Sequence, residues 1–130
     1  MDELLAAAEE ALASSYAPYS DYGVGAALAT ADGTVYTGCN IENANYSNSV
    51  HAEELAISKA IEAGEREFQA IAVVSSERDG VTPCGMCRQT LAEFCADSFT
   101  VYCLEADDTV SEYTLGELLP NTITAAHLDK

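Results

Sequence analysis

An eight-residue apolar segment between two helical patterns is the feature that most constrains the fold of this chain. Residues 68–75 are strongly apolar, which is typical of a strand buried on both faces of a sheet. Residues 51–63 before it have a helical pattern that ends at Gly64, and a second helical pattern opens at Pro83. Because both faces of such a strand must be covered, this order predicts layers of helix and sheet.

Further elements on either side extend this pattern into one α/β domain over residues 1–130. The Asp-Gly turn around Ala31-Asp32-Gly33 predicts a hairpin, and the helices after it predict parallel crossovers. The other expected elements are a helix, four strands and a last helical turn, at residues 2–15, 24–30, 34–39, 100–104, 110–113 and 115–119. The predicted fold class is a three-layer α/β/α domain with a mixed five-stranded sheet.

The charge of the chain is strongly acidic. Twenty-two Asp and Glu residues face five Lys and Arg residues, which gives a net charge of −17. Such a charge repels nucleic acid and anionic membranes, whereas a hydrophobic content of 48% argues against disorder. At molar salt the Debye length falls to about 3 Å, so crowded carboxylates no longer repel one another. We therefore expect a halophilic source. The lack of a signal-peptide pattern or long apolar run favours the cytoplasm.

Five cysteines make a disulfide scaffold improbable, because their number is odd and the chain looks intracellular. Cys84 and Cys87 form a Cys-x-x-Cys pair, which reducing compartments use for metal binding or redox chemistry. Cys39, Cys95 and Cys103 have apolar neighbours in the sequence, so we interpret them as small buried side chains.

One imidazole and two thiols are placed at the starts of two successive predicted helices. His51 begins the first helix, and Cys84 and Cys87 begin the second, where we expect Pro83 in the first helical position. This donor set suits Zn²⁺, and we expect the helix N-terminus to lower the pKa of the thiols. Three protein ligands leave a fourth position open for water, as in catalytic zinc sites. Glu53 is close enough in the chain to reach that water as a general base without being a ligand.

Each part of this pattern has an ordinary alternative. A Cys-x-x-Cys pair alone also fits a structural zinc site or a thioredoxin-like redox pair, and a lone His at a helix start is often a cap or surface residue. The combination of His-x-Glu with Pro-Cys-x-x-Cys is more specific, because it is the signature of zinc-dependent deaminases. The combination therefore favours a catalytic zinc ion held by His51, Cys84 and Cys87.

Over nearly its whole length the chain resembles the cytidine deaminase family, in its small homotetrameric form. The resemblance is carried by four ordered segments, residues 19–28, 38–46, 83–89 and 117–120. It implies hydrolytic deamination of cytidine and deoxycytidine in pyrimidine salvage, with one zinc ion per subunit. In that mechanism hydroxide on the zinc attacks C4 of the base, and Glu53 carries the protons.

The resemblance also implies which residues contact the nucleoside. Asn40 and Glu42 would hydrogen-bond the ribose hydroxyls, and Tyr22 would line the pocket where the family often has Phe. The main chain of Ala52 would contact the base, and Tyr46 would lie near a subunit junction beside the substrate. Asn40 and Glu42 could instead cap their Asn-rich loop, and Tyr46 could be an ordinary packing residue.

The chain departs from the family pattern at three positions. His51 stands where small relatives usually have Cys, and Glu54 stands where they have Arg. Zinc with two thiolates and a neutral imidazole carries no net charge, so no neighbouring cation is needed, and we expect Glu54 to point outward to solvent. Ile123 stands where the family often places a Phe that reaches a neighbouring subunit.

Two further functions remain open from the sequence. The first is deamination of another small aminopyrimidine, such as a nucleoside antibiotic, by the same zinc unit. The second is a non-catalytic, zinc-stabilised nucleoside-binding domain, which would not require Glu53. The acidic charge disfavours a polynucleotide deaminase.

Overall fold

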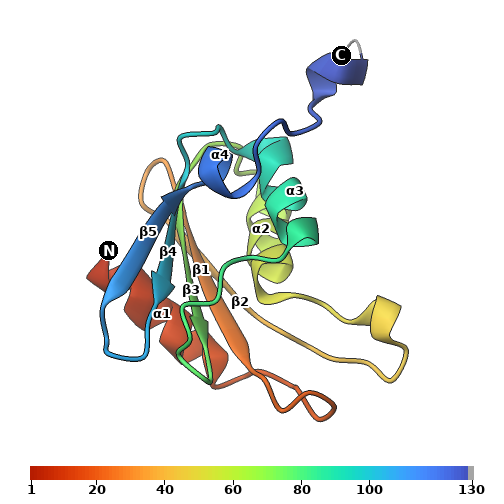
Figure 1. The fold of residues 1–130 in the computed structure, drawn as a ribbon. Coiled ribbons are helices and arrows are strands. Elements are labelled where there is room, and N and C mark those ends of the chain that lie inside the picture. Colours follow the sequence, from red (N-terminus) through yellow and green to blue (C-terminus); the bar gives the residue numbers. More distant parts are fainter. Residues whose placement is uncertain (129–130) are drawn as a thin grey trace.

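A mixed five-stranded sheet lies at the centre of the computed structural model, which describes residues 1–128 (Figure 1). The strand order is β2-β1-β3-β4-β5. The strands are β1 (Val24–Thr30), β2 (Val35–Cys39), β3 (Phe68–Ser75), β4 (Thr100–Leu104) and β5 (Val110–Thr114). The helices are α1 (Asp2–Leu12), α2 (Ala52–Glu62), α3 (Gly85–Phe94) and α4 (Leu115–Leu118), with short 3-10 turns at Tyr46–Asn48 and Ala125–Leu128. The predicted α/β fold class is confirmed.

The connections between strands follow from their directions. The β1–β2, β1–β3 and β4–β5 pairs are antiparallel, and β3–β4 is the parallel pair. A parallel pair needs a long crossover, which α3 provides, whereas the antiparallel hairpins need only turns. Consequently α2 and α3 both begin just beyond the same end of the sheet, where the predicted metal ligands lie.

Helices cover both faces of the sheet (Figure 1). On one face, α1 packs Leu4, Leu5 and Ala8 against alternate residues of β1 and β3. On the opposite face, α2 and α3 pack a second core that includes Ile57 and Leu91. Residues 70–75 of β3 are buried without interruption, as the apolar segment predicted. None of the described helices is long and apolar enough to cross a membrane.

Two glycines allow the helices to pack directly against the strands. A Cβ atom on Gly38 of β2 would lie 2.2 Å from the carbonyl oxygen of Ala52, in the first turn of α2. A Cβ atom on Gly25 of β1 would lie 2.1 Å from the carbonyl oxygen of Ala8 in α1. Gly38 therefore sets the distance between the sheet and the helix that carries His51 and Glu53.

Two expected helix limits are wrong, and both corrections concern the site. α1 ends at Leu12 instead of Ser15, and the backbone N–H of Tyr16 donates to the carbonyl of Asn40 at 3.0 Å. Pro83 is not the first helical residue, because Cys84 is the N-cap of α3 with extended backbone angles (φ −68°, ψ 169°). Pro83 is instead a fully buried residue in the segment that leads into the helix.

The five cysteines are free, as expected. Cys39 and Cys103 are buried in strands, and Cys95 is partly buried at the end of α3. Burial raises the pKa of Cys95 and Cys103 to about 12, so both are neutral, unreactive thiols at physiological pH.

Candidate active site

The N-termini of α2 and α3 bring the three predicted metal ligands together. His51 is the N-cap of α2, Cys84 is the N-cap of α3, and Cys87 lies in the first turn of α3. The His51 Nδ1 atom is 3.2 Å from the Cys84 Sγ atom and 3.4 Å from the Cys87 Sγ atom. The three donor atoms lie within 4.8 Å of one another. The geometry also identifies Nδ1 as the donor nitrogen, which the sequence could not do.

The spacing of these donors fits a tetrahedral zinc ion. Zinc–sulfur bonds of about 2.3 Å and zinc–nitrogen bonds of about 2.0 Å place N and S about 3.5 Å apart in tetrahedral geometry. The two observed N–S distances are close to this value. A borderline-soft ion such as Zn²⁺ is the natural occupant of one imidazole and two thiolates.

Cys87 shows why a cation is needed here. Its side chain is fully buried, and burial raises the pKa of its thiol, with the negative charge of Glu53 acting in the same direction. Burial of the Cys87 thiol therefore acts against the lowering of its pKa that we expected from the helix N-terminus. A metal ion compensates for this cost by bonding the thiolate directly.

Glu53 lies beside the ligand cluster, in the first turn of α2. Its side chain is 5% exposed, and burial raises the pKa of the carboxyl, while a backbone N–H hydrogen bond lowers it by a smaller amount. A raised pKa makes the carboxyl a better proton acceptor than an exposed glutamate, as a general base requires.

Glu54 does not point outward to solvent as expected. Its Oε1 atom accepts a hydrogen bond from the backbone N–H of His51 at 3.1 Å. This is the return bond of a capping box, in which an acidic side chain at the third helical position satisfies the N-cap amide. Glu54 therefore holds the backbone of the ligand His51 in place.

A cavity of about 530 Å³ opens beside the ligand cluster, a volume within the range of small-molecule sites. His51, Glu53 and Cys84 form one wall. Val24 and Val81 provide apolar surface. The predicted substrate residues Asn40, Glu42, Ala52 and Tyr46 also line this cavity. Tyr22 does not.

Glu42 is fixed by the loop that precedes β1. Its Oε1 atom accepts from the backbone N–H groups of Tyr19 and Ser20, at 3.0 and 3.1 Å, and its Oε2 atom accepts from the Ser20 hydroxyl. These bonds lower the pKa of Glu42, with the Ser20 hydroxyl as the largest cause. One lone pair on Oε2 is left over for a ligand hydroxyl.

Asn40 serves the protein's own backbone as well as the cavity. Its Oδ1 atom accepts from the backbone N–H of Val24 at 2.9 Å and from the Ser15 hydroxyl. Its Nδ2 atom donates to the carbonyl of Tyr22 at 2.8 Å. These contacts agree with the alternative in which Asn40 caps its own loop. The second N–H of the Asn40 amide is left for a ligand.

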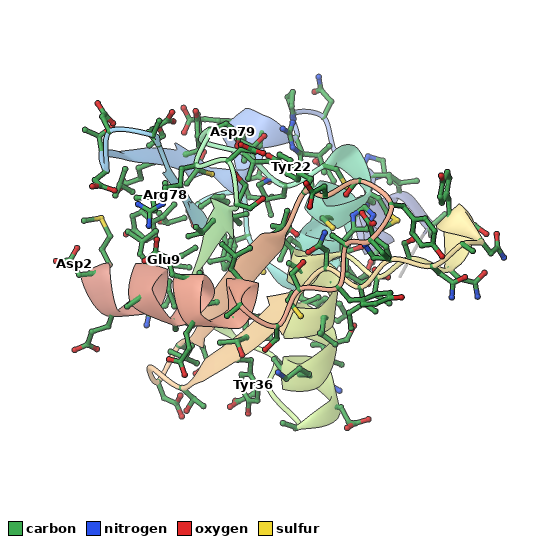
Figure 2. The ribbon with its side chains drawn as sticks, turned by 90° about the horizontal axis from the view of Figure 1, so that it is seen from below. Asp2, Glu9, Tyr22, Tyr36, Arg78 and Asp79 are labelled. Carbon is green, nitrogen blue, oxygen red and sulfur yellow. The ribbon has the colours of Figure 1, made fainter. Side chains whose placement is uncertain are left out.

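Tyr22 lies outside the cavity, beside Asp79 (Figure 2). Its hydroxyl donates to the Asp79 carboxylate at 2.8 and 2.9 Å, and the Ser75 hydroxyl donates to the same carboxylate at 2.8 Å. Tyr22 therefore ties the loop before β1 to the turn after β3. Tyr46 is 75% exposed, and its ring meets that of Tyr19 edge-on at 6.2 Å.

Sequence reasoning missed the residues that complete the cavity wall. Ser20 and Thr82 line the cavity, and Arg88 supports it from α3. Ser20 and Arg88 both lie inside the motifs on which the resemblance rests. Their positions in those motifs were the available signal, but their hydrogen-bond partners, which include Glu42 for Ser20 and Leu118 for Arg88, cannot be read from a local pattern.

Such a site, with three zinc-type donors, an adjacent buried carboxyl and an open cavity, is typical of mononuclear zinc hydrolases. The family model described as "Cytidine and deoxycytidylate deaminase zinc-binding region" matches residues 1–103. The chain is 44% identical over 128 residues to a cytidine deaminase of Sporosarcina psychrophila, covering 98% of this chain and 94% of the relative. It is 43% identical over 126 residues to a cytidine deaminase of Halalkalibacterium halodurans, covering 97% and 96%.

Solved structures agree with the sequence comparisons. The cytidine deaminase of Burkholderia pseudomallei superimposes with a TM-score of 0.89 at 42% identity, covering 94% of this chain and 98% of that one. The cytidine deaminase of Mycobacterium tuberculosis superimposes with a TM-score of 0.83 at 34% identity, covering 94% and 95%. The chain belongs to the cytidine and deoxycytidylate deaminase family.

Proposed function

We propose that this protein converts cytidine and deoxycytidine to uridine and deoxyuridine, with water consumed and ammonia released. The observation that carries the proposal is one cavity holding three kinds of group. These are two of the three zinc-type donors, His51 and Cys84, the buried carboxyl of Glu53 and the fixed carboxylate of Glu42. The relatives' names as cytidine deaminases support the same activity.

The charge of the cavity favours a nucleoside over a nucleotide. No Lys or Arg is among the residues that line it, within the described part of the chain. A phosphate group there would meet the carboxylate of Glu42 without a compensating cation, at a cost in binding. A ribose or deoxyribose hydroxyl can instead donate to the Glu42 Oε2 atom and accept from the remaining N–H of Asn40.

The chemistry at the base follows from the position of Glu53. Bound zinc supplies a Lewis acid that makes water reactive near neutral pH. Glu53 takes a proton from the attacking water and delivers it to N3 of the base as the new C4–O bond forms. Glu53, again unprotonated, takes the remaining proton from the new C4 hydroxyl and delivers it to the amine as the C4–N bond breaks, which releases ammonia and leaves the C4 carbonyl of the product. Its burial keeps bulk water from competing for these protons.

The direct test monitors four compounds by ultraviolet absorbance with zinc-loaded protein at high salt. Cytidine and deoxycytidine should be converted, whereas dCMP and cytosine should react far more slowly. Conversion of dCMP at the rate of deoxycytidine would contradict the nucleoside assignment. No conversion of any of the four by the zinc-loaded protein would contradict the enzymatic function and favour a binding domain.

Replacing Glu53 by Gln tests the proton carrier. The amide is close in shape but cannot accept and return protons, so turnover should fall by about 10²–10⁴-fold. Zinc content should stay at one ion per chain, because Glu53 is not among the three donors. Substantial residual turnover in Glu53→Gln would show that another group moves the protons.

We further propose that the chain acts as one domain in a homotetramer in the cytoplasm. The exposed side chains of Tyr46 and Ile123, at 75% and 55%, support an assembly that covers them. Light scattering should give four times the 13.7 kDa mass of the chain. A monomer at enzyme-assay concentration would contradict the tetramer, while leaving the chemistry intact.

A further inference from the structure

Arg88 donates hydrogen bonds in three directions from the first turns of α3. Its Nε atom donates to the carbonyl of Pro83 at 2.6 Å, and its Nη1 atom donates to the carbonyl of Leu118 at 2.7 Å. Its Nη2 atom donates to the Thr82 hydroxyl at 2.8 Å. The half-buried guanidinium thus joins the segment before α3 to the last residue of α4.

Two of the bonds that Arg88 makes fix the peptide units on either side of Cys84. The side chain holds the Pro83 carbonyl, which belongs to the peptide before the Cys84 Cα atom. The backbone N–H of Arg88 donates to the Cys84 carbonyl at 2.9 Å, which belongs to the peptide after it. Because these two planes set φ and ψ of Cys84, they also set the direction of its Cα–Cβ bond and the region its Sγ atom can reach.

This support matters because Cys84 has little else to hold it. Its side chain is exposed, whereas that of Cys87 is fully buried and packed. Its extended backbone angles lie outside the helix that would otherwise constrain them. The buried Pro83 carbonyl would also lose its partner without the guanidinium, which is costly for a buried acceptor.

We propose that Arg88 is a positioning residue that aims the Cys84 thiolate at the metal and holds Thr82 on the cavity wall. This inference rests on the proposed zinc site, and it assigns a role to a residue that is neither a ligand nor in contact with substrate. A Lys at this position has one nitrogen and cannot reach three acceptors that a planar fork reaches together.

Zinc retention provides a test that is separate from catalysis. Zinc-loaded wild type, Arg88→Gln, Arg88→Lys and Arg66→Gln are mixed with a chromogenic chelator, and the rate of zinc transfer is followed. Arg66 is a matched control, because it also donates to two backbone carbonyls, those of Ile61 and Glu65, but at the far end of α2. Loss of Arg66 removes the same unit of charge without touching Cys84.

Removing a partner that orients a ligand usually lowers metal affinity by about 10- to 100-fold, so Arg88→Gln should transfer zinc faster than wild type by a similar factor. Arg88→Lys should fall between the two, and Arg66→Gln should match wild type. With Co²⁺ in place of zinc, the sulfur-to-metal charge-transfer and d–d bands should change in Arg88→Gln but not in Arg66→Gln. These bands report ligand geometry, which a purely global loss of stability does not alter in the folded fraction.

Two results would overturn the proposal. Wild-type zinc transfer and cobalt spectra in Arg88→Gln would show that Cys84 needs no such support. Wild-type behaviour of Arg88→Lys would show that the charge alone matters. If Arg88→Gln does not fold, Arg88→Lys against Arg66→Gln decides the question. An active wild type with an unaffected Arg88→Gln contradicts this inference alone, whereas a zinc-loaded but inactive wild type contradicts the proposed function.

Discussion

Gly38 offers a way to move the active-site helix without touching the active site. Replacing it by Ala would place a Cβ atom 2.2 Å from the Ala52 carbonyl oxygen and 2.7 Å from the Ala56 backbone nitrogen. Both are backbone atoms of α2, so no side-chain rotation can relieve the contact. Relief needs α2 to move by about 1 Å, and overpacking of this kind costs about 1–3 kcal/mol of unfolding free energy.

The displacement should affect catalysis more than stability alone would. α2 carries His51 and Glu53 at its N-terminus, next to Ala52. A misplacement of about 1 Å can lower a rate by about a hundredfold. We therefore expect kcat/KM for cytidine to fall about a hundredfold in Gly38→Ala, measured by loss of ultraviolet absorbance under conditions where the variant is fully folded.

Gly25→Ala is the matched control. Its Cβ atom would lie 2.1 Å from the Ala8 carbonyl oxygen, so it displaces α1, on the face of the sheet opposite the site. Urea unfolding should show a similar loss of stability in both variants, whereas kcat/KM for cytidine should fall strongly only in Gly38→Ala. An equal loss of kcat/KM in the two variants, or a normal kcat/KM in a destabilised Gly38→Ala, would refute the reasoning.

Four further predictions concern single contacts or the surface charge. Tyr22→Phe should lower the unfolding free energy by about 0.5–1 kcal/mol, and adding Asp79→Asn to this variant should lower it little further. If the losses of the two substitutions add up in urea unfolding, the two residues are not coupled. Glu54→Gln should keep the hydrogen bond to the His51 N–H and the wild-type unfolding free energy, whereas Glu54→Ala should lower that free energy by about 0.5–1 kcal/mol in the same assay. Equal unfolding free energies of Glu54→Gln and Glu54→Ala would exclude the cap. Hydrogen bonds hold the pKa of Glu42 below its ordinary value of 4.5, so Glu42 stays ionised and KM should not rise until the pH falls below that value. A rise in KM between pH 5 and 7 that Glu42→Gln abolishes would contradict this. Both described salt bridges use Arg78, so most of the carboxylates have no paired cation in the described residues. The melting temperature should therefore fall steeply as salt is diluted, because the carboxylates then repel one another. A melting temperature that does not depend on salt would exclude halophilic adaptation.

The order of elements and most strand limits could be predicted because they depend on local patterns. The strand at residues 68–75 matches its prediction because a continuous apolar run ends where polar turn residues begin. The C-terminal end of α1 and the start of α3 could not be predicted from local patterns, because hydrogen bonds that form only in the folded chain set them. Tyr16 bonds to the backbone of Asn40, and the Pro83 carbonyl bonds to the Arg88 side chain.

The same distinction separates the metal ligands from the cavity wall. Cys84 and Cys87 are three residues apart, and His51 begins the preceding helix, so a short motif specifies the donor set. The environment of Glu42 depends on bonds from a loop more than twenty residues away, which no local pattern encodes. These contacts form only in the folded chain, where the loop before β1 and the segment after β2 meet at the end of the sheet.

Glu54 links the charge of the metal site to the cap of α2. An Arg at this position could accompany a three-thiolate zinc site, but it could not accept a hydrogen bond from the His51 N–H, because a guanidinium has only donors. A carboxylate can accept that bond, and it does so here. With His51 as a neutral ligand the site needs less positive charge, so the position is free to serve as a helix cap. Arg88 is the cation that contacts the ligand loop through its bonds to the Pro83 and Cys84 carbonyls, and it acts on Cys84 through the backbone and not through contact with the metal.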